Sequence, residues 1–318
     1  MTTMPIEPIK ISPTEDGIRL NRWFGRHYPA VAPAEFHKLC RTGQIRVNAG
    51  RVRGREVLYT GDLVRIPPSV ANRAVAVQSG PKKNDGSGFS MADLEQLRRA
   101  IIYNDDDIAV FNKPAGLAVQ GGTGISKSLD KMIVALFPND RPMIVHRLDR
   151  ETSGVIVIAK NQIAAQNLSA QFADNTVAKE YIALLHGRVN PKSGKIDNFI
   201  AADNKVKPQR AITKYRALGG LGHILTWVAF APETGRTHQL RIHSATFLHA
   251  PIVGDAIYGD NAKIEDPTLS AIITTKNLFL FARRITIRHP VTGKTLTFTA
   301  EMPEFMKSVA EFLELRLP

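Results

Sequence analysis

Alternation of hydrophobic and polar positions predicts an α+β chain whose strands are concentrated after residue 100. Apolar stretches rich in β-branched and aromatic residues, which are typical of strands, lie at 101–103, 108–111, 155–159, 179–187 and 224–230. Three consecutive aspartates separate the first two stretches, and this pattern predicts a β-hairpin. Apolar residues spaced four apart, at Ala164, Leu168 and Phe172, predict an amphipathic helix. A short helix near the C-terminus is predicted to bury Phe305, Val309 and Phe312.

The first third of the chain has a different pattern and predicts a small unit of helices and short strands. Arginines recur at helical spacing beside Leu20, Trp23 and Phe24, and a second helical stretch follows Pro33. Short strands are predicted within two segments that contain glycine and alternating apolar residues, 43–50 and 61–66. The pattern therefore predicts two helices followed by paired strands.

Breaks in these patterns predict the domain boundaries. Residues 1–15 lack periodicity and are expected to be a flexible tail. A small domain is predicted at 16–80, followed by a linker at 81–95 that is rich in turn-forming and charged residues. A second, larger domain is then expected at 96–318.

The net charge of the chain indicates a polyanionic partner. The 318 residues carry a formal net charge of +13, which favours either nucleic acid or an anionic membrane surface. No apolar run approaches the roughly 20 residues needed to cross a bilayer, and the N-terminus lacks a signal-peptide pattern. We therefore expect a cytoplasmic protein that binds nucleic acid and not a membrane. Cys40 is the only cysteine, so an intrachain disulfide is impossible.

The segment 145–154 holds a carboxylate, Asp149, between Arg147 and Arg150 and directly before the apolar run 155–159. Neighbouring cations favour the charged form of a carboxylate, and a tight turn that enters the core would fix its position. Such a carboxylate can act as a nucleophile. From the chemistry alone, a surface cluster of ion pairs is an equally good interpretation.

The residues His-Arg-Leu-Asp-Arg-Glu-Thr-Ser-Gly at 146–154 resemble the motif HRLDxxTSG of the RluA family of pseudouridine synthases. The resemblance implies that Asp149 attacks the target nucleotide and that Arg147 fills the space left by the flipped base. His146 is expected to contribute to substrate binding. A Lys-x-Tyr sequence ending at Tyr181 resembles the family's tyrosine motif, whose tyrosine stacks on the target base. Tyr181 is therefore a candidate catalytic residue, which could also serve as the general base for the later proton removal.

A third segment, Gly-Arg-Thr-His-Gln-Leu-Arg-Ile-His at 235–243, also resembles a motif of this family. The resemblance implies that Arg241 pairs with the catalytic aspartate. Arg236 and His238 are further candidates for substrate binding. His238 and His243 lie five apart and do not share a helical face, so we favour hydrogen bonding over zinc ligation. The sequence departs from the family at His249, Ala250 and Phe281, which leaves local packing and substrate choice open.

The amino-terminal pattern resembles the S4-like RNA-binding domain that such enzymes often carry in front. Ten Lys and Arg against three Asp and Glu lie between Gly17 and Pro68. Arg19, Arg22 and Arg41 are the candidates for contacts with RNA phosphates.

The resemblance implies a mixed, mainly antiparallel catalytic sheet preceded by this small domain. It implies an RNA pseudouridine synthase that needs no cofactor or metal. The expected substrate is large-subunit rRNA, free or in ribosome assembly intermediates. The enzyme is expected to be a monomer. A tRNA-specific enzyme and a non-catalytic RNA-binding or ribosome-assembly protein are the alternatives. Whether Asp149 attacks ribose carbon 1 or ring carbon 6 stays open.

Overall fold

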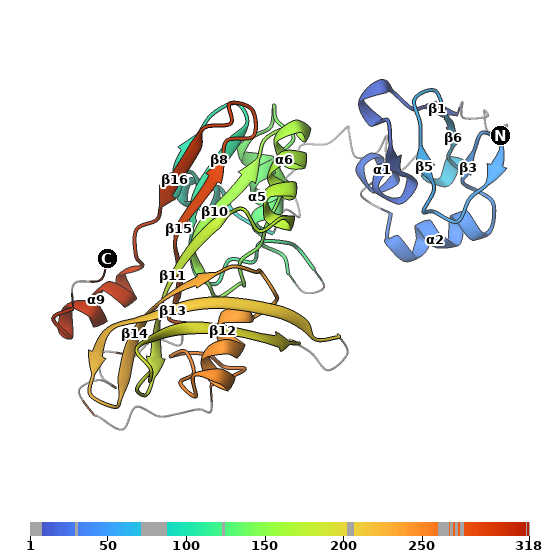
Figure 1. Ribbon diagram of the computed structural model, residues 1–318. Helices are drawn as coiled ribbons and strands as arrows, with labels where there is room; N and C mark the ends of the chain where they lie inside the picture. The colour runs from blue at the N-terminus through green and yellow to red at the C-terminus, as the bar shows by residue number, and fades with distance from the viewer. Residues whose placement is uncertain are drawn as a thin grey trace. The chain divides into compact units, whose positions relative to one another are not determined.

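The computed structural model describes residues 8–28, 31–70, 88–122, 125–201, 207–259 and 277–315, together with single positions 267, 270, 273 and 317. The chain divides into two compact units, Met1–Asp85 and Gly86–Pro318 (Figure 1). No helix in the described part of the chain is long and apolar enough to span a membrane.

The amino-terminal unit packs two helices against short antiparallel strands. Its elements are β1 (Ile9–Lys10), a 3-10 helix η1 (Pro13–Glu15), β2 (Ile18–Arg19), α1 (Leu20–His27), α2 (Pro33–Arg41), β3 (Arg46–Val47), β4 (Gly50–Arg51), β5 (Val57–Leu58) and β6 (Leu63–Arg65). One sheet has the order β1-β6-β3-β4, and β2 pairs with β5. Trp23, Phe24 and Phe36 lie in the buried core between these elements. The predicted pair of helices and the two predicted strand regions are confirmed.

The prediction of a flexible tail is wrong for its second half. Residues 1–7 lie outside the described residues, but Ile9 and Lys10 form β1 and pair with β6. Ile11 is fully buried. Its backbone N–H donates to the carbonyl of Asp62 at 2.8 Å. The prediction was wrong here because a strand of two residues is too short to show an alternation of apolar and polar residues in the sequence.

The predicted linker also ends earlier than expected. Residues 81–87 lie outside the described residues, and α4 (Met91–Arg99) begins within the segment predicted to be linker. Ser90 and Asp93 form a capping box, in which each side chain accepts a hydrogen bond from the backbone N–H of the other residue. This cap starts the helix at a point where the apolar pattern is weak.

The larger unit is built on one mixed sheet of ten strands. Its main path has the order β12-β13-β14-β11-β15-β10-β8-β7, while β9 pairs with β10 and β16 with β15. Among the strands described for this sheet, only β10 and β15 pair in parallel, and the other pairs are antiparallel. The strands are β7 (Ile101–Asn104), β8 (Ile108–Lys113), β9 (Met143–Ile144), β10 (Ser153–Ala159), β11 (Ala178–His186), β12 (Ser193–Ile200), β13 (Gln209–Leu221), β14 (Leu225–Pro232), β15 (Leu280–Arg288) and β16 (Thr295–Thr299). The expected mixed, mainly antiparallel sheet is confirmed.

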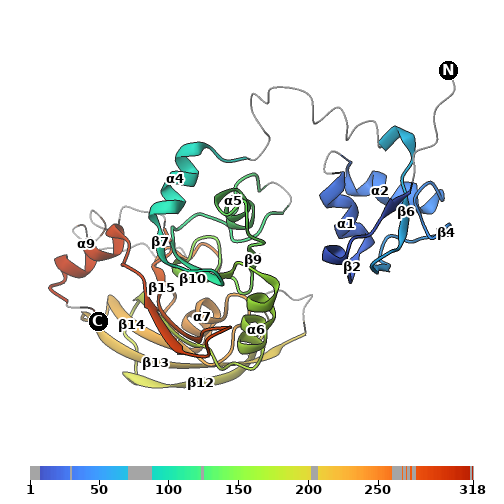
Figure 2. The same ribbon diagram turned by 90° about the horizontal axis from the view of Figure 1, so that it is seen from above.

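Helices lie against this sheet and near its ends. Besides α4 they are α5 (Leu129–Leu136), α6 (Gln162–Ala173), α7 (Gln239–Ile242), a π-helical turn η2 (His243–Phe247) and α9 (Glu304–Phe312). The helix α6 packs on β9, β10 and β15. Figure 2 shows α7 within the curve formed by the long strands β12, β13 and β14. This placement brings α7 to the side of the sheet that carries the cleft described below.

The helices predicted from apolar spacing form, but three phenylalanines of their predicted apolar stripes are not fully buried: Phe172 and Phe305 are half-buried and Phe312 is exposed. In α6, Ala164 and Leu168 are buried. In α9, Val309 is buried together with Met306 and Ala310, whereas Phe312 is 48% exposed. The buried stripe of α9 therefore follows i, i+3 and i+4, and the prediction that Phe312 is buried is wrong.

Candidate active site

Asp149 lies in the loop between β9 and β10, and the strand that follows it is completely buried. The predicted turn into the core is therefore confirmed. At the start of β10, Gly154 has φ +113°, and a Cβ there would lie 2.1 Å from the carbonyl oxygen of Ala282 on β15. Only glycine fits this approach, which lets the strand after Asp149 pair with β15.

A buried lysine holds the other side of the Asp149 loop. The ammonium of Lys113 donates to the carbonyl oxygens of Pro114, Leu117 and Arg150 at 2.9, 2.8 and 3.0 Å. Three carbonyls match the three protons of an ammonium. Burial lowers the pKa of Lys113 to about 7, although the charges of Glu151 and Asp149 oppose this shift. The lysine thus ties the residue next to Asp149 to the end of β8.

Arg241 faces Asp149 from α7, with 3.5 Å between Arg241 Nη1 and Asp149 Oδ2. Its stronger partner is Asp255, whose two carboxylate oxygens accept from Arg241 Nε and Nη2 at 2.8 and 2.6 Å. Both side chains are buried. Asp255 therefore fixes the guanidinium, and the remaining nitrogen points at Asp149.

Asp255 belongs to a turn that also orients His238, the second side chain that faces Asp149. The hydroxyl of Tyr258 lies 3.0 Å from Nδ1 of His238. Nε2 of the same ring lies 3.9 Å from Asp149 Oδ2. Burial lowers the pKa of His238, with the charge of Asp149 opposing the shift. A neutral ring with Nε2–H toward Asp149 and Nδ1 accepting from Tyr258 fits these contacts.

Tyr181 comes from β11 and lines the same cleft as Asp149. Its side chain is half-buried. Burial, and then the charge of Asp149, raise the pKa of the Tyr181 phenol above its ordinary value. The hydroxyl therefore stays protonated at neutral pH, which suits stacking and hydrogen-bond donation more than proton removal.

These side chains line a cleft of about 390 Å³. Four cations and a single carboxylate, Asp149, contribute to its wall: Arg147, Lys179, Arg236 and Arg241. The cleft is thus strongly positive around one nucleophile candidate. The predicted site residues of the larger unit all line it: His146, Arg147, Asp149, Tyr181, Arg236, His238 and Arg241.

Three of the predicted binding residues differ in their contacts and in their exposure to solvent. His146 Nε2 accepts the backbone N–H of Val157 at 2.9 Å, and its ring stacks on Phe172. Burial lowers the pKa of His146 to about 3, so the ring is neutral and contributes to the cleft wall. Arg236 Nε donates to the carbonyl of Arg210 at 3.1 Å. Arg147 is exposed, and no described carboxylate lies within ion-pair distance of it.

Arg19, Arg22 and Arg41 lie in the amino-terminal unit and are not part of this cleft. All three side chains are exposed. Nη1 of Arg19 donates to the carbonyl of Arg55 at 3.4 Å.

The two histidines of the 235–243 segment each make a hydrogen bond, as predicted. His238 pairs with Tyr258, and His243 Nδ1 lies 3.0 Å from the hydroxyl of Thr213. Thr213 also accepts from the side-chain amide of Gln239, which is buried. These bonds fasten α7 to β13 and so hold Arg241 in place.

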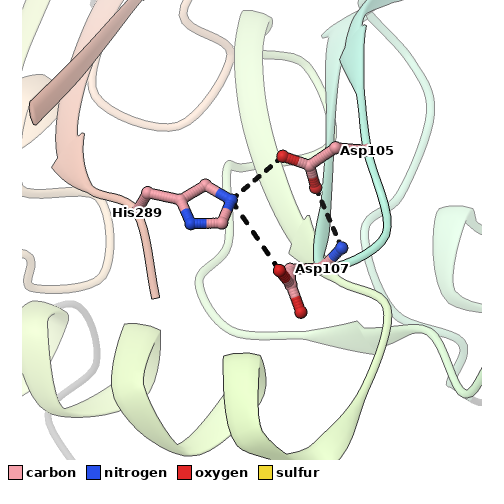
Figure 3. A group of neighbouring side chains, drawn as sticks. All are labelled: Asp105, Asp107 and His289. Carbon is pink, nitrogen blue, oxygen red and sulfur yellow. Dashed lines mark hydrogen bonds and ion pairs between the residues drawn. The ribbon is translucent and has the colours of Figure 1, made fainter. Parts of the chain in front are cut away.

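A separate cluster, Asp105, Asp107 and His289, is the one group in the described ranges with the spacing of metal ligands (Figure 3). Nδ1 of His289 accepts the backbone N–H groups of Val291 and Thr292, so the proton is on Nε2. Nε2 then donates to Asp105 at 2.9 Å. A metal on Nε2 would move the proton to Nδ1, where it would face two N–H groups. The cluster therefore fits hydrogen bonding.

The three consecutive aspartates form the predicted hairpin turn. Asp105 Oδ1 accepts the backbone N–H groups of Asp107 and Ile108 at 2.9 and 2.8 Å, which closes the turn between β7 and β8. His289 lies after β15, so its bond to Asp105 connects two hairpins.

Sequence reasoning missed Asp255, Tyr258, Lys113 and Lys179 as parts of the site. A signal for Asp255 existed: it is a lone carboxylate in the otherwise uncharged stretch 251–259, and a carboxylate in such a stretch requires a partner. The partner itself lies 14 residues away and is visible only in the fold.

Comparison with known proteins identifies the family of the chain. Residues 107–246 match the family model for RNA pseudouridylate synthase. "Ribosomal large subunit pseudouridine synthase C" of Haemophilus influenzae is 32% identical over 97% of this chain and 95% of its own length. The protein of the same name from Escherichia coli is 30% identical over 96% of each chain.

Solved structures show the same fold. The structure named "Human RNA Pseudouridylate Synthase Domain Containing 4" is 26% identical, with a TM-score of 0.61 over 73% of this chain and 98% of that chain. A second human structure, "RNA Pseudouridylate Synthase Domain Containing 1", has a TM-score of 0.53 over 70% of this chain. The match to the family model and the identity along nearly the whole chain lead to one conclusion: the chain belongs to the RNA pseudouridylate synthase family.

Proposed function

We propose that this protein converts uridine to pseudouridine in large-subunit rRNA, with Asp149 as the nucleophile. The observation that carries the proposal is the positive cleft in which one carboxylate faces Arg241 and His238 beside Tyr181. The choice of RNA rests on the names of relatives that are 30 to 32% identical along nearly their full lengths. On the same ground we propose a cytoplasmic location.

The reaction requires an accessible base. A uridine within folded RNA must be flipped out, at a cost of a few kcal/mol. Arg147 lies two residues before Asp149 and is exposed at the cleft. It is positioned to occupy the space that the base leaves. Tyr181 then offers its ring for stacking on the flipped uracil.

Asp149 attacks the nucleotide at ribose carbon 1 or ring carbon 6. The bond between N1 and the ribose breaks, uracil turns, a bond forms between C5 and the ribose, and the bond between Asp149 and the nucleotide breaks, which frees the carboxylate. The proton on C5 is lost and N1 gains one, so the reaction is an isomerisation. Arg241 and the Nε2–H of His238 hold the carboxylate in position for this attack.

Tyr181→Phe separates stacking from proton transfer. The substitution keeps the ring and removes a hydroxyl that is protonated at neutral pH, so RNA affinity should stay within about twofold of the parent. If the hydroxyl does not remove the proton, we expect single-turnover pseudouridine formation to fall by no more than about tenfold. Accumulation of a covalent intermediate in this variant would instead assign the base role to Tyr181.

The amino-terminal unit is proposed to be an S4-like domain that binds the RNA backbone. Its support is the order of two helices followed by short strands, and the exposure of Arg19, Arg22 and Arg41. Phosphate contacts position a protein without reading sequence. The unit would therefore raise affinity for structured rRNA without taking part in the chemistry.

A triple variant, Arg19→Gln, Arg22→Gln and Arg41→Gln, tests this role in the full chain. Each phosphate contact contributes about 0.7 to 0.9 to the slope of log affinity against log salt, so the slope should flatten by about 2. Binding of an rRNA fragment at several salt concentrations measures it. If the slope does not change, these arginines face something other than RNA.

Pseudouridine mapping tests the substrate directly. Total RNA from cells with and without the gene should differ at uridines of large-subunit rRNA. A difference confined to tRNA would favour the tRNA-specific alternative. If no position changed in any RNA while the purified protein still bound rRNA, the non-catalytic alternative would stand.

A further inference from the structure

Lys179 is a cleft residue for which the reaction as described has no role. It lies on β11 two residues before Tyr181, and both side chains line the cleft. Its ammonium lies 3.5 Å from the carbonyl oxygen of Thr234, and a Cβ built on Gly235 would be 3.9 Å from it. Within the described residues, no carboxylate lies within ion-pair distance of Lys179.

Two other lysines of this unit show how the fold normally satisfies a buried ammonium. Lys113 reaches three carbonyl oxygens at 3.0 Å or less. Lys160 pairs with Asp140 at 3.2 Å and also donates to the carbonyl of Asp105. Lys179 has one long contact for three protons. The remaining protons of this half-buried ammonium are available to a ligand that enters the cleft.

The other cleft cations are occupied or lie at the mouth. Asp255 and Asp149 pair with Arg241, and Arg236, which donates to a backbone carbonyl, is exposed. Arg147 is exposed. Lys179 is thus the cation inside the cleft that is left for a bound anion.

We propose that Lys179 binds a backbone phosphate of the RNA next to the flipped uridine. The inference rests on the proposed function, since the cleft must hold an RNA strand. Lys179 and Tyr181 are two residues apart on β11, a separation of about 7 Å along the strand. A base stacked on Tyr181 therefore brings its own sugar–phosphate toward Lys179, and the ammonium supplies a charge-assisted hydrogen bond. Burial lowers the pKa of Lys179, and a phosphate beside it would favour the charged form.

The test compares three full-length variants with the parent: Lys179→Gln, Lys179→Arg and Lys195→Gln. Lys195 is the matched control, because it removes the same charge from a lysine that pairs with Glu233 at 3.3 Å and does not line the cleft. Affinity for an rRNA fragment that the parent modifies is measured from low to high salt. Single-turnover pseudouridine formation is measured against RNA concentration. Thermal unfolding confirms that each variant is folded.

Lys179→Gln should flatten the salt slope by about 0.7 to 0.9 and raise the half-saturating RNA concentration by about tenfold. Lys179→Arg should keep the parent slope, because the charge remains, and Lys195→Gln should keep both values.

Two results would overturn the role of Lys179. One is a parent-like salt slope in Lys179→Gln. The other is a loss of rate at saturating RNA, in both Lys179→Gln and Lys179→Arg, with affinity unchanged, which would mean that the amine transfers a proton. A parent protein that forms no pseudouridine in any RNA would instead count against the proposed function.

Discussion

Asp149→Asn is expected to abolish pseudouridine formation, by at least about 10⁴-fold, while RNA affinity changes by less than about threefold. The amide has nearly the shape of the carboxylate but cannot act as the nucleophile. Arg241 should stay in place, because Asp255 and not Asp149 holds it with two hydrogen bonds. The loop should also stay in place, because Lys113 binds the Arg150 carbonyl. Single-turnover formation of pseudouridine in an rRNA fragment measures the loss.

Glu151→Gln is the matched control. Glu151 is a half-exposed carboxylate two residues further on, it pairs with Arg150 at 3.5 Å, and it does not line the cleft. The substitution removes the same charge from the same loop, so the Glu151→Gln variant should keep a rate within about threefold of the parent. Turnover near the parent rate in Asp149→Asn would rule out the proposed nucleophile.

The parts of this site that could be predicted from sequence are those with a local signal. An uncharged run of β-branched residues predicts the buried strand after Asp149, because such residues are rarely left exposed in a run. The spacing of Ala164 and Leu168 predicts α6 for a similar reason. The resemblance to a family then adds roles that spacing alone does not give.

The interactions that organise the site have no local signal. Asp255 and Arg241 are 14 residues apart, and nothing in their neighbourhoods shows that they form a bidentate pair. The ammonium of Lys113 contacts the carbonyl of Arg150, 37 residues later, only because β8 and β10 are neighbours in the sheet. Short elements such as β1 are missed for a different reason, because two residues show no periodicity.

Asp255→Asn is expected to have the second large effect, on both stability and catalysis. Burial alone would raise the pKa of Asp255, but hydrogen bonds from Arg241 and from the N–H groups of Tyr258 and Ile257 outweigh it and lower the pKa. The amide cannot compensate the buried guanidinium, so we expect the free energy of unfolding to fall by about 3 to 5 kcal/mol. Arg241 and the turn that orients His238 would both lose their anchor, and the single-turnover rate should fall more than RNA affinity does.

Asp197→Asn provides the control, because Asp197 also forms a bidentate pair with an arginine, Arg210, at 2.8 and 2.7 Å, but on the surface. An exposed ion pair contributes little to stability, so that variant should unfold at nearly the same denaturant concentration as the parent. The pH dependence tests whether Asp255 is ionised in the folded protein. A carboxylate with a lowered pKa stabilises the fold above its unfolded pKa, near 4, and the contribution is lost as the pH falls through the folded value. The difference in unfolding free energy between the parent and Asp255→Asn should therefore be constant from about pH 5 to 8 and shrink below about pH 4. Denaturant unfolding across this range measures it, and a gap that persists unchanged to pH 2 would contradict an ionised Asp255 as the anchor of Arg241.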